Sequence, residues 1–176
     1  MVDNKMKTNN GKGNTVDRDD WETPQELWNK LNKQYKFNVD CCATKENAKC
    51  NYFSSNLVSE FLYPINAKIL YGMCWMNPPF SKAYEMFEQF FIVNHGIAIY
   101  RCDNLETKLW QDIILKNATW ILIPKGRISY EGKAGKGSRF PSALIGYKVD
   151  VPKHIKGSIL ICKQTEMRRN ESIRKI

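Results

Sequence analysis

The sequence predicts an α/β domain whose mixed, mostly parallel sheet is covered by helices on both faces. Between residues 21 and 123, short apolar runs alternate with stretches whose apolar residues recur at helical spacing. This alternation is typical of a parallel sheet buried between two helical layers. After Pro124, three strand-like runs follow with no helix between them, which is typical of an antiparallel sheet edge.

The two ends of the chain differ from its middle in composition. The 176 residues fit one domain. Residues 1–20 hold hardly any apolar side chains, so we expect a flexible arm there, a single domain over 21–165 and a basic tail over 166–176. The polar start lacks the apolar core of a signal peptide, and no run approaches the roughly 20 apolar residues of a membrane span. We therefore expect a cytoplasmic protein without a membrane segment.

The first helix is predicted to begin just after Trp21. Thr23 is expected as its N-cap, Pro24 as its first residue and Glu26 as the partner that closes a capping box. Trp21 would then fit a hydrophobic staple ahead of this cap. One face of the helix should be buried, because apolar residues recur there at helical spacing: Leu27, Trp28, Leu31 and Tyr35.

Two predicted strands each end on a polar residue. The runs 36–40 and 69–76 lead to Asp40 and Asn77, and Ser81 is then expected to cap a second helix. The buried face of that helix would consist of Ala83, Phe87, Phe90 and Phe91. The remaining elements are a helix over 105–116 and strands over 96–100, 119–123, 128–130, 143–147 and 158–162.

The six cysteines are expected to be reduced thiols, because disulfide frameworks are rare in cytoplasmic proteins. A zinc site would need Cys41, Cys42 and Cys50. Neither paired CxxC spacing nor a nearby histidine supports one, so we predict no metal. Cys50 fits a packed core thiol instead.

The stretch Asn77-Pro78-Pro79-Phe80 is the strongest indication of chemistry. It follows an apolar strand and precedes a helix, which places it in the crevice where open α/β sheets bind ligands. The two prolines stiffen the loop. The Asn77 side-chain oxygen and the Pro78 carbonyl can accept both hydrogens of an amino group and stabilise positive charge that develops on it. Phe80 can stack on a base that has left the duplex. The alternative is a proline-rich turn that ends a core strand.

The sequence resembles the phage-encoded Dam-type DNA N6-adenine methyltransferase family. The resemblance covers roughly residues 19–147, and its first half is the more specific. It rests on these stretches: Asp19/Asp20 to Pro24, Phe37 to Ala43, Lys49 to Tyr52, Trp75 to Ser81, Gly126 to Ile128, and Pro141-Ser142.

The resemblance implies a Rossmann-like methyltransferase fold that binds S-adenosylmethionine. The expected cofactor-binding residues are Trp21, Thr23, Pro24, Asp40, Cys42 and Ala43. At this point the sequence departs from the general methyltransferase pattern, since Cys41-Cys42-Ala43 replaces the usual glycine-rich loop. Asp40 also fits a turn or capping acid, and Trp21 also fits stacking on the cofactor or base.

The charge balance favours a polyanionic partner. Lys and Arg outnumber Asp and Glu by 27 to 18, and each neutralised phosphate releases counterions. Double-stranded DNA is the expected partner. Its expected contacts are Ser81 and Lys82, and then Arg127, Lys133, Lys136 and Arg139 of a glycine-rich loop, which also fits a solvated surface loop.

These observations predict methyl transfer to adenine N6 in DNA, catalysed by Asn77, Pro78, Pro79 and Phe80. The family resemblance implies a phage or prophage enzyme, whose methylation can protect DNA from host restriction. Only 36 residues separate Asp40 from Asn77, which leaves little room for a target-recognition domain and favours short or relaxed specificity. The alternatives are an RNA or protein-glutamine methyltransferase, or a catalytically silent DNA-binding module.

Overall fold

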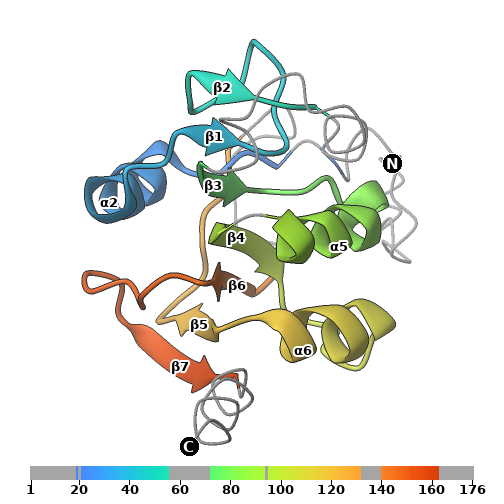
Figure 1. The fold of residues 1–176 in the computed structure, drawn as a ribbon. Coiled ribbons are helices and arrows are strands. Elements are labelled where there is room, and N and C mark those ends of the chain that lie inside the picture. The colour runs from blue at the N-terminus through green and yellow to red at the C-terminus, as the bar shows by residue number, and fades with distance from the viewer. Residues whose placement is uncertain (1–18, 20, 56–71, 94, 132–139, 163–176) are drawn as a thin grey trace, which may run out of the picture.

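A single seven-stranded sheet forms the centre of the computed structural model, counted over the residues that it describes (19, 21–55, 72–93, 95–131 and 140–162). The strand order is β2-β1-β3-β4-β6-β5-β7 (Figure 1). The strands are β1 Val39–Asp40, β2 Tyr52–Phe53, β3 Met73–Met76, β4 His95–Arg101, β5 Trp120–Pro124, β6 Ser142–Tyr147 and β7 Gly157–Ile161.

The sheet is mixed, as expected. Neighbouring strands are parallel from β2 through β1 and β3 to β4, whereas β6 is antiparallel to both β4 and β5, and β7 is antiparallel to β5. Parallel and antiparallel pairs are thus equally frequent, and the expectation of a mostly parallel sheet is not confirmed. The placement of β6 near an edge was wrong. Its six residues are all buried, and it lies inside the sheet between two strands.

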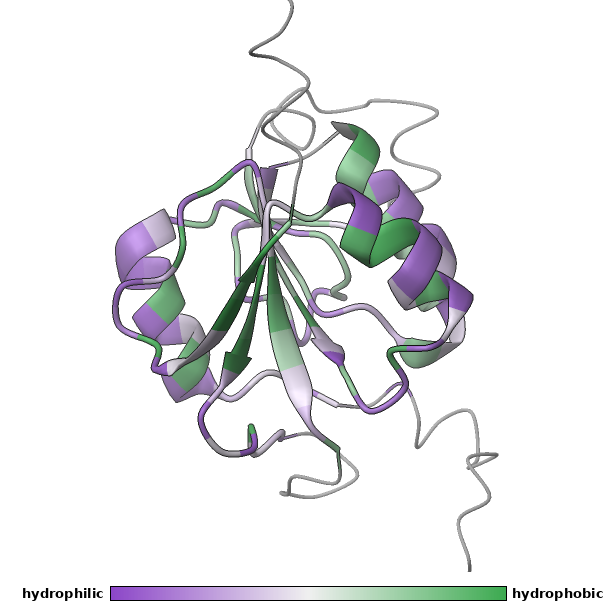
Figure 2. Ribbon diagram, turned by 90° about the horizontal axis from the view of Figure 1, so that it is seen from below, coloured by the Kyte–Doolittle hydropathy of each residue, from purple (hydrophilic) through white to green (hydrophobic). Residues whose placement is uncertain are grey.

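Helices cover both faces of the sheet, as the sequence predicted (Figure 2). Helix α2, Gln25–Tyr35, lies on one face, and α5, Ala83–Val93, lies with α6, Leu115–Asn117, on the other. Side chains alternate between the two faces along a strand. In β3, Trp75 therefore packs in the core on the α2 side, whereas Cys74 and Met76 pack in the core on the α5 side.

The predicted cap of the first helix is wrong, although its buried face is confirmed. Leu31 and Tyr35 are buried, with Leu27 and Trp28 packed partly against the same core. The helix begins at Gln25 with Pro24 as its N-cap and no side-chain hydrogen bond there. Thr23 is instead buried, and its hydroxyl has no partner among the described residues. Glu26 does not close a capping box, because it pairs with Lys30 one turn later.

The second predicted helix has the expected core face but a different start. Ala83, Phe87, Phe90 and Phe91 are buried. Ser81 does not cap α5, because it lies inside a 3-10 turn, η1 Phe80–Lys82, whose N-cap is Pro79. Its amide and its hydroxyl both donate hydrogen bonds to the Asp19 carboxylate.

Two further elements differ from the prediction. The helix expected over 105–116 is a π-helix, η2 Leu109–Ile114, that continues into the short α6. No strand forms over 128–130, because Ile128 and Tyr130 fill the core from an irregular segment. Glu131 makes only an isolated antiparallel bridge with Glu22.

Most of the remaining strands lie where the sequence predicted them. β2 lies in a stretch for which no strand was predicted, and β3 ends at Met76 as expected, with residues 69–71 of its predicted run outside the described residues. β4, β5, β6 and β7 cover the expected runs within one or two residues, whereas β1 keeps only the last two residues of its run. Among the helices that the structure describes, none is long and apolar enough to cross a membrane.

Candidate active site at the ends of β1 and β3

The strand order reverses between β1 and β3. The chain passes from β1 to β2 on one side of the sheet and returns to β3 on the other side of β1. β1 and β3 are parallel, with Val39 opposite Cys74 and Asp40 opposite Trp75, so their carboxyl ends meet at the same edge. Open α/β sheets bind ligands in the crevice outside such a switch point.

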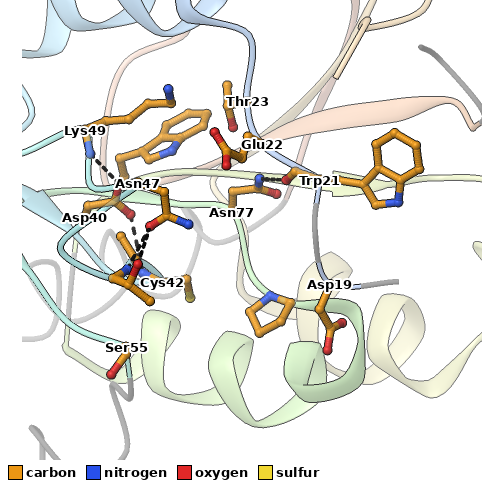
Figure 3. A pocket seen from close by; sticks show the side chains of 14 residues that line it. Asp19, Trp21, Glu22, Thr23, Asp40, Cys42, Asn47, Lys49, Ser55 and Asn77 are labelled. Atoms are coloured by element: carbon orange, nitrogen blue, oxygen red, sulfur yellow. Dashed lines mark hydrogen bonds between the residues drawn. The ribbon is translucent and has the colours of Figure 1, made fainter. Parts of the chain in front are cut away.

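A pocket opens at this edge of the sheet (Figure 3). It lies between the loop after β1, the end of β3 and the segment that leads into α2. Its lining includes five of the six predicted cofactor residues, all except Pro24, and Asn77 and Pro79 of the predicted catalytic loop. The full lining is Asp19, Trp21, Glu22, Thr23, Asp40, Cys42, Ala43, Thr44, Asn47, Lys49, Ser55, Trp75, Asn77 and Pro79.

Asp40 organises the loop that follows β1. Asp40 is buried, with 4% of its surface exposed. Its carboxylate accepts a hydrogen bond from the backbone amide of Lys49 at 3.1 Å and a weaker one from that of Cys42 at 3.4 Å. Burial raises the pKa of Asp40, and the two backbone donors partly oppose that rise. The side chain therefore has the hydrogen bonds of a turn acid and also lines the pocket.

The other wall of the pocket is a short segment that we call the strap, residues 19 and 21–23. Three sets of hydrogen bonds hold it. Asp19 accepts from the Ser81 amide at 2.9 Å and from the Ser81 hydroxyl at 2.5 Å. The Trp21 carbonyl accepts from Asn77 Nδ2 at 2.6 Å, and Glu22 exchanges two backbone hydrogen bonds with Glu131. The strap is thereby bonded directly to the Asn77–Ser81 loop.

The hydrogen bond to Trp21 fixes the Asn77 side chain. With its Nδ2 donating to the Trp21 carbonyl, the remaining polar atom of the amide is Oδ1, an acceptor. Pro78 is buried, and Pro79 has φ of −58° and continues directly into the η1 turn. The loop can therefore present a fixed acceptor to a planar amino group.

Phe80 ends this loop and does not line the pocket. Its ring packs edge-on against Tyr100 and Phe140, with centroids 5.6 and 5.2 Å away. The Trp21 indole packs edge-on against Phe140 and Tyr130. These contacts form an aromatic cluster of Trp21, Phe80, Tyr100, Tyr130 and Phe140. Its Trp21 indole lies on the side of Asn77 opposite Asp40 (Figure 3).

The predicted DNA contacts are partly described. Ser81 and Lys82 are exposed beside the aromatic cluster, and Arg127 is exposed in the loop after β5. Ser81 makes its hydrogen bonds with Asp19. Lys133, Lys136 and Arg139 lie outside the described residues, as do most of the predicted arm and the tail over 166–176.

Several residues of the site were missed at the sequence level. Asn47 and Lys49 line the pocket from the irregular stretch after β1, and Asp19 lies in the segment that was expected to be a flexible arm. Arg101 and Asp103 pair at the end of β4 beside Phe80. Asp19 and Lys49 lie in stretches that carry the family resemblance, whereas Asn47, Arg101 and Asp103 could be found only by position, because each follows the carboxyl end of a predicted strand. The six cysteines carry free thiols.

Comparison with known protein families gives one informative match. No curated protein matches the chain. Residues 10–173, nearly the whole chain, match the Dam family, described as DNA N-6-adenine-methyltransferase. The match confirms the family resemblance and implies an enzyme that methylates adenine N6, with DNA as its substrate. The chain belongs to the Dam family of DNA N-6-adenine-methyltransferases.

Proposed function

We propose that this protein transfers the methyl group of S-adenosylmethionine to N6 of adenine in DNA, with the cofactor in the pocket between the strap and β1. The observation that supports this most directly is the position of Asn77. It lies at the border between this pocket and the aromatic cluster, and its amide is oriented by the Trp21 carbonyl. A methyl donor and a base held on these two sides would meet at Asn77.

The lining of the pocket suits a cationic ligand that also carries hydroxyl and amino groups. Three carboxylates, those of Asp19, Glu22 and Asp40, line it together with one lysine, Lys49. The Thr23 hydroxyl is buried without a hydrogen-bond partner among the described residues, and Thr23 lines the pocket. Buried polar atoms in proteins are nearly always satisfied, so an unpaired one at a pocket wall fits a ligand contact.

S-adenosylmethionine, when bound, supplies a sulfonium methyl group that an adenine amino nitrogen can take up. The Asn77 oxygen and the Pro78 carbonyl would accept hydrogen bonds from that amino group and stabilise the positive charge that grows on it. Phe80 would stack on the base, which must leave the duplex to reach the site. Pro79 would keep the loop rigid, so that alignment supplies much of the rate acceleration.

The finer fold assignment is part of the same proposal. Four neighbouring parallel strands, a switch point between β1 and β3 and helices on both faces support a Rossmann-like methyltransferase fold. A phage or prophage origin and protection of DNA from host restriction are proposed on the family resemblance of the sequence alone, and a cytoplasmic location remains an expectation from the polar start of the chain. A short or relaxed recognition site is expected, with DNA contacts from Ser81, Lys82, Arg127, Lys133, Lys136 and Arg139.

The test is to incubate the protein with unmethylated DNA of mixed sequence and methyl-labelled S-adenosylmethionine, and then to identify the labelled nucleoside. We expect label in N6-methyladenine, and a loss of roughly 100-fold or more in rate for Asn77→Ala, which removes a fixed acceptor. Asn29→Ala is the matched control, because Asn29 is an exposed asparagine on α2. Label in RNA or in protein glutamine, but not in DNA, would contradict the proposal, as would a protein that fails to bind the cofactor.

A further inference from the structure

Arg101 lies where the aromatic cluster meets the end of β4. Its guanidinium carbon is 5.5 Å from the centroid of the Phe80 ring and 5.3 Å from that of Phe140. Both distances are within the range of a cation–π contact. The centroids of the two rings are themselves 5.2 Å apart, with an angle of 69° between the ring planes. One guanidinium therefore contacts both rings of the pair.

We propose that Arg101 is a positioning residue that fixes the orientation of Phe80, the ring on which the target adenine stacks, by holding it against Phe140, which is buried at 6% exposure. The inference rests on the proposed function, and it deepens that function by assigning a role to a residue pair, Arg101 and Asp103, outside the Asn77–Phe80 loop. Arg101 would act through the two rings and would not contact a DNA phosphate.

Asp103 holds the guanidinium in place through two hydrogen bonds. Arg101 Nε donates to one carboxylate oxygen at 2.6 Å, and a terminal nitrogen donates to the other. This pairing lowers the pKa of Asp103, so the carboxylate stays charged at neutral pH. A guanidinium bonded in this way has two of its five donors occupied and its charge balanced, which makes it a poor phosphate contact.

The backbone on either side of the Arg101 side chain is also fixed. The Arg101 carbonyl accepts from Trp110 Nε1 at 3.1 Å, and Cys102 N donates to the Pro141 carbonyl at 2.9 Å. The second bond joins the end of β4 to the segment that carries Phe140. The guanidinium, Phe140 and Phe80 are thus held by separate segments of the chain that meet at this point.

A fixed orientation of the Phe80 ring matters for a stacked base. Stacking of a base on an aromatic side chain depends on the orientation of the ring, and Phe80 follows two prolines on a loop that is otherwise held by the strap. Phe80 is half-buried, so part of its surface is open to a ligand. Arg101 would limit the orientations that the ring adopts before the base arrives.

The test compares Arg101→Lys and Asp103→Asn with wild type by kcat, KM for DNA, and the salt dependence of DNA binding. The lysine keeps the charge but lacks the planar fork, and the asparagine keeps the shape of the aspartate but weakens the pair. We expect each variant to lower kcat about tenfold, with the DNA dissociation constant and the slope of log K against log salt unchanged. Asp112→Asn, which weakens the surface ion pair with Lys116, is the matched control and should keep wild-type kcat.

The outcomes separate the possible roles. Wild-type kcat in Arg101→Lys would overturn the inference, because charge alone would then suffice. Wild-type kcat in Asp103→Asn would also overturn it. If a variant bound DNA more weakly and its slope of log K against log salt fell by about one, Arg101 would be a phosphate contact, and the positioning role would be overturned.

The proposed function and this inference fail in different ways. A wild-type protein that places no label in DNA would overturn the proposed function and this inference with it, whereas equal activity of wild type and both variants would overturn the inference alone. Thermal melting checks that each variant is folded.

Discussion

At the scale of single residues, two side chains of the pocket have hydrogen-bond arrangements that the local sequence does not explain. Asn77 donates its amide hydrogen to a backbone carbonyl of the strap, so its oxygen remains as an oriented acceptor. Thr23 is 1% exposed, yet its hydroxyl has no partner among the described residues. The hydrogen bond to the strap constrains the Asn77 side chain, and the unpaired Thr23 hydroxyl lowers the stability of the fold. A bound ligand would form hydrogen bonds with both side chains.

Thr23→Val should separate folding from cofactor binding. Valine has nearly the same shape but no hydroxyl, so it removes an unsatisfied buried group, and the free energy of unfolding should stay the same or rise by about 1 kcal/mol. The dissociation constant for S-adenosylmethionine should rise about fivefold, the equivalent of one lost hydrogen bond. Thermal melting and isothermal titration calorimetry measure the two quantities.

Thr107→Val is the control for this substitution. The Thr107 hydroxyl donates to the Asn104 carbonyl at 3.0 Å, away from the pocket, so its loss should lower stability and leave cofactor affinity unchanged. Equal cofactor affinity in Thr23→Val and wild type would show that this hydroxyl does not contact the ligand.

At the scale of elements, the strap and the Asn77–Ser81 loop behave as one unit. The strap bonds to both ends of the loop, at Asn77 through Trp21 and at Ser81 through Asp19. Its other edge pairs with Glu131, just before most of the predicted basic loop. The geometry of the Asn77–Ser81 loop therefore depends on a distant segment, since Asp19 lies 62 residues before Ser81 in the chain.

Asp19→Ala should lower kcat for methyl transfer about tenfold, because the η1 turn loses both hydrogen bonds that anchor it and the reacting groups lose alignment. Asp19→Asn keeps an oxygen acceptor for the Ser81 amide and should retain most of the activity. Steady-state kinetics with labelled S-adenosylmethionine measures both variants.

Asp112→Ala provides the control for the loss of a carboxylate, since Asp112 pairs with Lys116 on the surface of the η2 and α6 segment, away from the pocket. If Asp19→Ala kept wild-type kcat, the strap would be a packing element without influence on the reaction.

At the scale of the whole molecule, the net charge of +9 should govern how the protein meets DNA. The active-site edge of the sheet carries the pocket, the aromatic cluster and the exposed Lys82 together. A positively charged surface near this edge would bring the DNA backbone to the Asn77–Ser81 loop. The affinity should then fall steeply as salt is added.

Lys82→Ala should reduce the slope of log K against log salt by about one, because one phosphate contact is lost, while the methylated base stays the same. Lys30→Ala, on α2 and paired with Glu26, should leave the slope unchanged. Fluorescence anisotropy with a labelled duplex at several salt concentrations measures the slopes. An unchanged slope in Lys82→Ala would place the DNA on another part of the surface.

The sequence by itself determined the parts of this protein that depend on neighbouring residues. Apolar spacing predicted the buried faces of α2 and α5, and apolar runs predicted β4 through β7. The order of strand, Asn77–Phe80 and helix predicted a site at the carboxyl edge of the sheet, where the pocket lies. These features are local, since periodicity and turn residues act within a few positions along the chain.

Tertiary structure alone decided the features that join distant segments. Strand order placed β6 inside the sheet, and packing took Thr23 and Ser81 away from the helix caps that their positions predicted. The hydrogen bonds from Asn77 to Trp21 and from Ser81 to Asp19 span 56 and 62 residues. Local sequence cannot predict such contacts, because they exist only once the strands have paired and brought the two segments to the same edge of the sheet.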